Sequence, residues 1–382
     1  MISREVYRND SAAIEWLRFP LIVCVVFIHS FGEPVDMTLI DWTSLSGNDI
    51  YDIIRVLFSR VITHSAVPCF YFISGYLFFL NIQKLDKSSW LTKMRKRVRT
   101  LLVPYILWNV IFIAATCGKL ILKWLLGMSG AEDITSWFND NGGLPGLFWN
   151  CSVWGESAVD WLGNPQRSSG PIDLPLWFLR DLIVVTVLTP IIYWLIKRCG
   201  LLFITVLGLA FVSKVWPLVD GFSIPAIFFF SCGAYMGINK ISISVFAKYE
   251  TLIYIITVLL IAADLYLGGP DTGIGNLVHP FFRISGVLAS FCIALRLRNK
   301  GHVRYPMLTK SVFFIYAFHC LHIIGYYFGG MWMDFFNNSN ELVKTLVYFL
   351  VPALKISACF IVFVLMERFT PRLLAILTGS RN

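Results

Sequence analysis

The sequence predicts an all-α fold: a polytopic membrane helix bundle of about ten transmembrane helices, with both termini in the cytoplasm. Hydrophobic residues make up 57% of the 382 residues and charged residues only 14%, whereas a soluble domain has roughly 25% charged residues. So little polar surface does not cover a soluble globule of this size. The apolar stretches have the length of helices, and the short alternating segments of a membrane β-barrel are missing.

The individual spans follow from the apolar stretches, each about the length that a helix needs to cross a bilayer. The first is not a cleavable signal peptide, because it is too long and carries Glu15 and Arg18. The ten predicted spans are 12–31, 56–80, 101–126, 175–196, 201–219, 222–239, 251–267, 277–295, 311–330 and 343–366.

Loop charge predicts the orientation of these spans. With the N-terminus inside, the inner segments hold 21 of the 32 Lys and Arg residues, and the outer segments hold two, Arg55 and Arg167. Basic residues favour cytoplasmic loops, so both termini are expected in the cytoplasm. The net charge of +9 is therefore explained by these loops, and no nucleic-acid partner is expected.

The whole chain, 1–382, is predicted to form a single membrane domain that contacts the lipid bilayer. It includes a basic inner loop, 81–100, and a long outer loop, 127–174, which is rich in Trp, Gly, Asn and Pro and has no clear period. Long ordered loops are often functional. This one is either a lid over substrate or a packed plug over the bundle.

Charges inside the first span are the strongest functional signal, because a charge in hydrocarbon is costly unless it faces protein or water. Arg18 and His29 are eleven positions apart, which puts them on one helix face, about 16 Å apart along the axis. Glu33 follows His29 by one turn. A fixed cation suits an anionic cofactor, and an imidazole suits proton transfer. Alternatively, Arg18 extends to the inner headgroups and His29 lies at the outer interface.

A second basic cluster lies in the inner loop and includes Arg95, Arg97 and Arg99. It either sets topology and contacts anionic lipid, or binds the phosphates of a nucleotide-like cofactor. The chain has no P-loop and no G-x-G-x-x-G motif, so ATP or NAD chemistry has no support.

Other ionisable residues fall in the outer parts of later spans and are expected to line a polar cavity open to the outside. These further candidates are Arg60, His64, Arg180, Asp181, His279 and Arg283. Arg180 and Asp181 are adjacent, so they should point in different directions and need separate partners.

The ninth span carries Tyr316, His319 and His322. Two histidines three residues apart could bring two ligands to a metal, but no acidic or cysteine partner is evident at matched depth. We therefore expect hydrogen-bonded histidines and no metal. The nine scattered cysteines include no C-x-x-C motif and are expected to act as small apolar side chains.

Five segments, in chain order, are similar to the motifs of one family. They are Arg18 with His29, Phe72-Ile73-Ser74-Gly75-Tyr76, Arg97 and Arg99 with Pro104, Leu176-Trp177-Phe178-Leu179, and Ser311 with Tyr316 and His319. Together they resemble the integral-membrane acyltransferase family 3, the bacterial glycan O-acyltransferases. The soluble extracytoplasmic domain that is fused to some members is not expected here.

The resemblance implies transfer of an acyl group, usually acetyl, from a cytoplasmic acyl-coenzyme A to a sugar hydroxyl of a cell-surface or lipid-linked glycan. The protein would then lie in the bacterial cytoplasmic (inner) membrane. By similarity, His29 would serve catalysis, and Arg18 with the Arg97 and Arg99 cluster would engage the donor.

Two mechanisms remain open for His29. It acts either as the general base on the acceptor hydroxyl, oriented by Glu33, or as a nucleophile that carries the acyl group. Two other functions also remain: a transporter or flippase of a glycan or glycolipid, and a receptor whose outer aromatic loop binds ligand. The receptor leaves the Arg18–His29 face unexplained.

Overall fold

The computed structural model describes residues 4–30, 32, 35–128, 130, 132–159, 165–217, 219–270, 273–299 and 305–380. The first half contains α1 (Arg4–Ile28), α2 (Gly47–Val56), α3 (Ala66–Phe79), α4 (Lys87–Arg97), α5 (Val103–Leu125), α6 (Glu132–Asp140), α7 (Gly143–Trp149), β1 (Cys151–Val159) and β2 (Pro165–Gly170). The second half contains α8 (Trp177–Val187), α9 (Thr189–Cys199), α10 (Leu201–Ser213), α11 (Ile224–Ile238), α12 (Glu250–Tyr266), α13 (Gly275–Asn299), α14 (Pro306–Phe318), α15 (His322–Gly325), α16 (Met331–Phe335), α17 (Glu341–Phe369) and α18 (Pro371–Leu377). Short 3-10 or π turns join several of them, at Met37–Leu39, Leu57–Val61, Ile62–Ser65, Val98–Leu102, Leu174–Leu176, Ile243–Tyr249 and Tyr326–Gly330.

The predicted spans fall on helices, but they differ in length. Six stretches of the described chain are long and apolar enough to cross a membrane alone: Asn9–Ile28, Gly47–Phe79, Lys87–Leu125, Ile243–Tyr266, Gly275–Arg298 and Glu341–Phe369. Spans 175–196 and 311–330 are helix pairs bent by 62° and 95°. Spans 201–219 and 222–239 contain helices of only 13 and 15 residues. The structure thus supports six to eight spans, and the count of ten stays a prediction.

Large apolar side chains on the outside of the bundle mark its lipid face. Examples that are more than half exposed are Leu202 and Leu209 of α10, Val258 and Leu259 of α12, and Leu346 and Ile361 of α17. A soluble monomer rarely exposes so much contiguous apolar surface. With the long apolar helices, this surface identifies a multi-pass membrane protein whose surroundings are a lipid bilayer.

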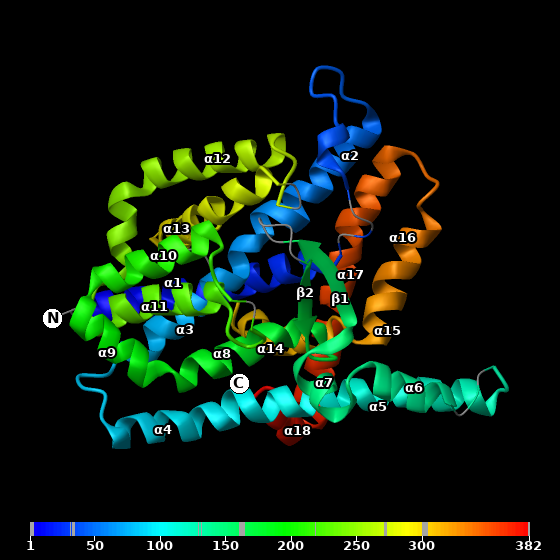
Figure 1. The fold of residues 1–382 in the computed structure, drawn as a ribbon, viewed down its shortest axis with the longest axis horizontal. Helices are drawn as coiled ribbons and strands as arrows, with labels where there is room; N and C mark the ends of the chain where they lie inside the picture. The colour runs from blue at the N-terminus through cyan, green and yellow to red at the C-terminus, as the bar shows by residue number, and fades with distance from the viewer. Residues whose placement is uncertain are drawn as a thin grey trace.

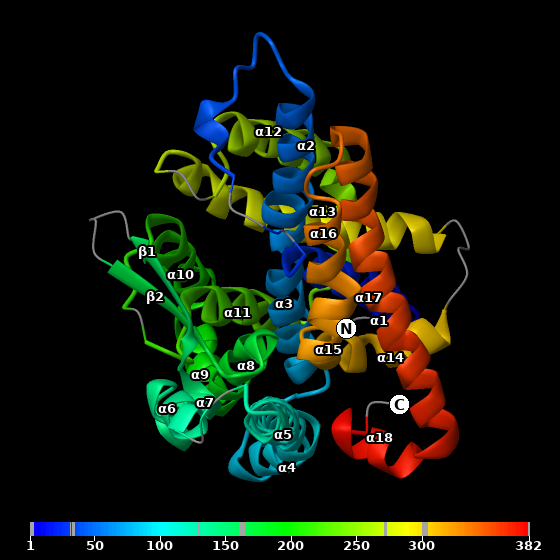
Figure 2. The same ribbon diagram turned by 90° about the vertical axis from the view of Figure 1, so that its right-hand side faces the viewer.

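The centre of the bundle is built around α1, which packs against α3, α13, α14 and α17. α3 stands between the group α8–α11 and the group α14–α17 (Figure 2). It lies very close to α11, because a Cβ at Gly75 would lie 2.0 Å from the Phe230 carbonyl oxygen and a Cβ at Gly233 would lie 2.0 Å from that of Phe72. Small residues permit such contact between membrane helices.

The outer loop 127–174 is ordered into two helices and a β ribbon, so the predicted all-α bundle carries one small pair of strands in this loop. β1 and β2 pair antiparallel, with Glu156 opposite Ser168, and the ribbon lies in front of the helices in Figure 1. The sequence of β2, PQRSSG, contains no large apolar residue and so carries no alternating apolar signal. At the base of the loop, the Ile172 N–H donates to the Leu147 carbonyl at 2.8 Å.

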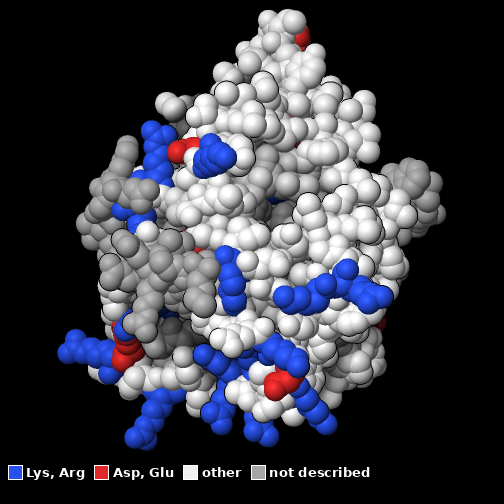
Figure 3. All heavy atoms as spheres, turned by 90° about the vertical axis from the view of Figure 1, so that its left-hand side faces the viewer, with Lys and Arg blue, Asp and Glu red and all other residues white. Residues whose placement is uncertain are grey.

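Basic side chains gather at one end of the molecule. Figure 3 looks at the end where the N-terminus and α9 lie in Figure 1, and it shows far more Lys and Arg than Asp and Glu. This distribution is the one that the positive-inside rule favours for a cytoplasmic face. The orientation of the termini stays a prediction.

Candidate functional site

A basic cavity of about 510 Å³ lies between α1, α3, α4, α8 and α14. Its volume falls in the range of about 300–1,000 Å³ that small-molecule sites have. Its cations are Arg18, Lys93, Lys96, Arg97 and Lys310, and no acidic residue of the described chain lines it. The remaining lining is largely apolar and aromatic, including Phe70, Phe178 and Tyr316. The cavity therefore suits a ligand with an anionic head and an apolar arm.

The structure separates the predicted arginines of the inner loop. Arg97 lines the cavity, and its guanidinium carbon lies 5.8 Å from the centre of the Phe78 ring. Arg95 and Arg99 do not line it, and both are exposed. The loop reaches the cavity because α4 continues through the turn Val98–Leu102 into α5, so that only one helix face meets the bundle.

Tyr316 is the last residue of α14 that lines the cavity. Its hydroxyl donates to the Pro175 carbonyl, and its ring packs edge-on against Phe178 with 5.9 Å between the centroids. Its backbone carbonyl accepts a hydrogen bond from His319 Nδ1 at 2.9 Å. Tyr316 thus connects the lining of the cavity with the histidines beyond it.

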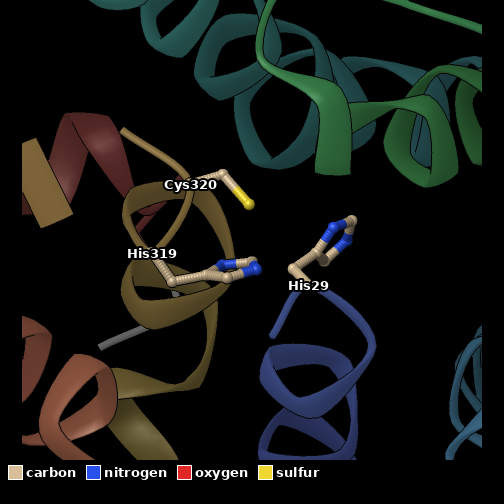
Figure 4. Close-up of side chains that lie close together, drawn as sticks. All are labelled: His29, His319 and Cys320. Carbon is tan, nitrogen blue, oxygen red and sulfur yellow. The ribbon is translucent and has the colours of Figure 1, made fainter. Parts of the chain in front are cut away.

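His29, His319 and Cys320 form a cluster between the end of α1 and the break after α14 (Figure 4). The imidazole centroids are 5.2 Å apart, and one ligand atom from each residue lies within 4.8 Å of the others. Nδ1 of His319 bonds to two carbonyls, of Ile315 and Tyr316, so it carries the proton and Nε2 carries the lone pair. Nε2 is buried and has no partner in the described chain.

The cavity and the cluster show where Arg18 and His29, predicted to share one helix face, place their side chains. Arg18 lines the basic cavity and His29 lies in a polar cluster, so neither side chain faces lipid. His29 itself is not part of the cavity lining. It is connected to the cavity through His319, which packs against His29 and hydrogen-bonds to the lining residue Tyr316. Glu33, predicted to orient His29, lies outside the described residues. The absence of a metal stays a prediction.

Lys355 of α17 is a buried cation that the sequence analysis missed. Its Nζ donates to the His29 carbonyl at 3.1 Å and to Ser30 Oγ at 3.2 Å, and the side chain is 5% exposed. A Cβ at Gly329 would lie 2.4 Å from Lys355 Cε, so a larger residue there would displace this side chain from its position. Lys355 lies inside a predicted span, and the rule that intramembrane charges are functional would have selected it.

Asp173 is a second missed residue, and it lies just before the bent span that begins at Leu174. It is 1% exposed, and neither carboxyl oxygen has a partner in the described chain. Its backbone is held on both sides: the Asp173 N–H donates to Asn109 Oδ1 at 3.2 Å, and its carbonyl accepts from the Leu176 N–H at 2.9 Å. Burial without donors raises the pKa of this carboxyl well above its ordinary value.

Arg180 and Asp181 pair with each other, so the expectation of separate partners is wrong. Arg180 Nη2 lies 3.0 Å from Asp181 Oδ1, and both side chains are buried. Arg180 Nη1 also donates to the Trp149 carbonyl at 2.5 Å. The long arginine side chain folds back along the helix, which adjacent positions on a helical wheel do not reveal. The pair fixes α8 to the base of the outer loop.

Of the residues predicted to line an outer polar cavity, only some are in contact with one another. His64 Nδ1 and His279 Nε2 are 2.9 Å apart, and His279 Nδ1 lies 2.6 Å from Asp264 Oδ2. Arg283, one turn after His279, lies over the Phe211 ring at 5.2 Å. Arg60 lies in the turn Leu57–Val61, four residues before His64. Asp264, inside the predicted span 251–267, is missing from the sequence-based candidates.

Comparison with known proteins gives the family. Residues 11–366 match the family described as "Acyltransferase domain". The chain is 27% identical over 383 residues to the "Succinoglycan biosynthesis protein ExoH" of Rhizobium meliloti (strain 1021), covering 98% of this chain and 93% of that protein. No solved structure matches. Since the match spans most of the chain and the family is the one that its motifs resemble, the protein belongs to the membrane acyltransferases, the integral-membrane acyltransferase family 3.

Proposed function

We propose that this acyltransferase moves an acyl group, most simply acetyl, from a cytoplasmic acyl-coenzyme A to a hydroxyl of an extracytoplasmic or lipid-linked glycan. The observation that carries the proposal is the basic cavity, one of whose lining residues, Tyr316, hydrogen-bonds to a histidine beside His29. The name of the relative from Rhizobium meliloti supports a glycan acceptor. The proposed location is the bacterial inner membrane.

The donor half of the proposal rests on charge and shape. Coenzyme A combines phosphates with a long neutral arm, and the cavity combines five cations with an apolar and aromatic interior. Guanidinium groups bind phosphate through charge-assisted hydrogen bonds. With its phosphates on Arg18 and Arg97, the thioester would extend past Tyr316 toward His29.

The acyl-transfer half rests on the cluster beyond Tyr316. In one mechanism His29 takes the proton from the acceptor hydroxyl as the C–O bond forms, and returns it to the departing thiolate. In the other, His29 attacks the thioester carbonyl and carries the acyl group to the hydroxyl. In both, Lys355 holds the His29 backbone from α17, and its positive charge would stabilise negative charge that develops on the carbonyl oxygen.

The test uses the purified chain in nanodiscs with acetyl-coenzyme A and a lipid-linked oligosaccharide. We expect release of coenzyme A together with an increase of one acyl group in the mass of the glycan. His29→Asn should abolish both. His322→Asn is the matched control, because His322 bonds to Thr116 and lies outside the cluster, and it should retain activity.

Two results would contradict the proposal. Full activity of His29→Asn would remove this imidazole from the mechanism. Movement of unmodified glycolipid across the membrane, with no release of coenzyme A, would identify a transporter or flippase instead. Mass spectrometry of surface glycans from cells with and without the gene identifies the acceptor.

A further inference from the structure

A buried chain of three side chains lies beside α1 and takes no part in the mechanism above. Asp264 comes from α12, His279 from the start of α13, and His64 from the turn Ile62–Ser65, which packs against α1 and α13. The hydrogen bonds are short: 2.6 Å from Asp264 to His279 and 2.9 Å from His279 to His64. Residues up to 215 positions apart in the sequence are thus joined in one line.

The line has a defined direction. An ionised Asp264 only accepts, so His279 Nδ1 carries a proton and donates it to the carboxylate. His279 Nε2 is then an acceptor, and His64 Nδ1 must donate to it. His64 Nε2 is left with a lone pair. No described residue bonds to that nitrogen, and it is not among the fully buried unpartnered atoms.

A carboxylate followed by an imidazole is the arrangement found where a carboxylate orients a catalytic base. A carboxylate that accepts from one imidazole nitrogen fixes the tautomer and stabilises the protonated ring, which makes the far nitrogen an effective proton acceptor. Here a second imidazole extends the arrangement by one hydrogen bond. The turn Ile62–Ser65 that carries His64 packs against α1, and His29 directly follows the last residue of α1.

We propose that His64 is the base that deprotonates the acceptor hydroxyl, with His279 and Asp264 as its positioning residues, and that His29 is therefore the nucleophile. The inference rests on the proposed function and selects one of its two mechanisms. Two imidazoles with different partners then have different tasks: His29 carries the acyl group and His64 handles the proton of the acceptor.

The steps balance as follows. A ring nitrogen of His29 attacks the thioester carbonyl, the C–S bond breaks, and the thiolate takes the proton of the other His29 nitrogen. The acceptor hydroxyl then attacks the acyl-imidazole carbonyl and gives its proton to His64 Nε2. The new C–O bond forms, the C–N bond breaks, and the departing His29 ring takes that proton from His64. No oxidant, reductant or further reactant is needed.

The test uses His64→Asn. The Asn amide nitrogen can still donate to His279 Nε2 in place of Nδ1, but the base at Nε2 is gone. We expect this variant to release up to one coenzyme A per protein and then stop, with the acyl group on His29 detectable by rapid-quench mass spectrometry. Transfer to glycan should fall about 10²–10⁴-fold, the usual contribution of a general base.

Asp264→Asn is the second variant, because it nearly preserves shape and so keeps the test valid if position 64 does not tolerate change. It removes the negative charge at the end of the line, and the same excess of coenzyme A release over glycan transfer should appear. Glu250→Gln is the matched control. It removes a carboxylate of α12 that pairs with Arg296 of α13 at 3.3 Å, far from the line, and transfer should stay within about threefold of wild type.

The outcomes distinguish the role of the Asp264–His279–His64 line, here called the relay, from the proposed function. Equal loss of coenzyme A release and glycan transfer in His64→Asn and Asp264→Asn would overturn the relay, and so would wild-type transfer in both. A wild-type protein that releases no coenzyme A would overturn the proposed function. In that case ¹⁵N NMR of His64 still decides the relay: a protonated Nδ1 and an unprotonated Nε2 support it, and the reverse tautomer refutes it.

Discussion

The contact between α3 and α11 gives a prediction whose size follows from the geometry. In Gly75→Ala, the new methyl group would lie 2.0 Å from the Phe230 carbonyl oxygen and 3.0 Å from the Ala234 nitrogen. A relaxed contact needs at least about 3.4 Å, so the helices must separate by about 1.4 Å at this point. A gap of 0.5–1 Å already loses about a quarter to a half of the attraction between facing atoms.

The expected cost of Gly75→Ala is about 1–3 kcal/mol in the free energy of unfolding, the usual range for overpacking. The same change should weaken binding of the donor, because the preceding residue, Ser74, lines the basic cavity. Thermal unfolding in detergent, followed by intrinsic fluorescence, measures the first effect. Equilibrium binding of acetyl-coenzyme A measures the second.

Gly118→Ala is the control for this experiment. Gly118 lies inside α5, and a Cβ there meets no atom within 4 Å. The substitution should leave the midpoint of thermal unfolding unchanged or raise it, because alanine favours a helix by about 1 kcal/mol over glycine. Equal midpoints for Gly75→Ala and wild type would refute the close contact between α3 and α11.

Three further predictions concern the site and its surroundings. Arg97→Gln should raise the Kd for acetyl-coenzyme A about tenfold, whereas Arg95→Gln, exposed and outside the cavity, should change it less than about threefold; equal effects in a binding titration would show that the loop acts only through its overall charge. Lys355→Met should lower the rate of acyl transfer about tenfold or more with donor affinity unchanged, because Lys355 holds the His29 backbone but does not line the cavity. Lys344→Met on the same helix, half-buried and bonded to Asn48, should not. Because burial raises the pKa of Asp173, the folded state retains a proton that the unfolded state releases as pH rises above the ordinary value of 3.8. The stability of wild type should therefore fall with pH relative to Asp173→Asn. Parallel pH profiles of the thermal unfolding midpoint for the two proteins would contradict this.

The sequence predicts the helices and much of the cavity because both depend on local signals. An apolar stretch of helical length needs no knowledge of its neighbours to be recognised. A costly intramembrane charge such as Arg18 likewise points to protein or water wherever it lies. Both signals can be recognised without any tertiary information, and they select Arg18, Arg97, His29 and His319 as candidates.

The remaining features depend on contacts between distant segments, which spacing does not encode. His64 and His279 are 215 positions apart and meet only because α13 packs beside the turn before α3. Lys355 contacts the end of α1 only because α17 lies against it. Cys320, expected from the sequence to act as a small apolar side chain, joins the cluster because the helix breaks directly after His319 with a bend of 95°. A turn of this kind has no sequence period.

The hydrogen bond from Tyr316 to Pro175 has a consequence for the cell as well as for catalysis. An enzyme that joins a cytosolic donor to an external acceptor risks becoming a leak for ions. Here the Tyr316 ring lines the basic cavity that we propose for the donor, and His319, with no exposed surface, hydrogen-bonds to the Tyr316 carbonyl. We therefore expect the resting protein to preserve the proton gradient, and Tyr316→Ala to let vesicles lose it.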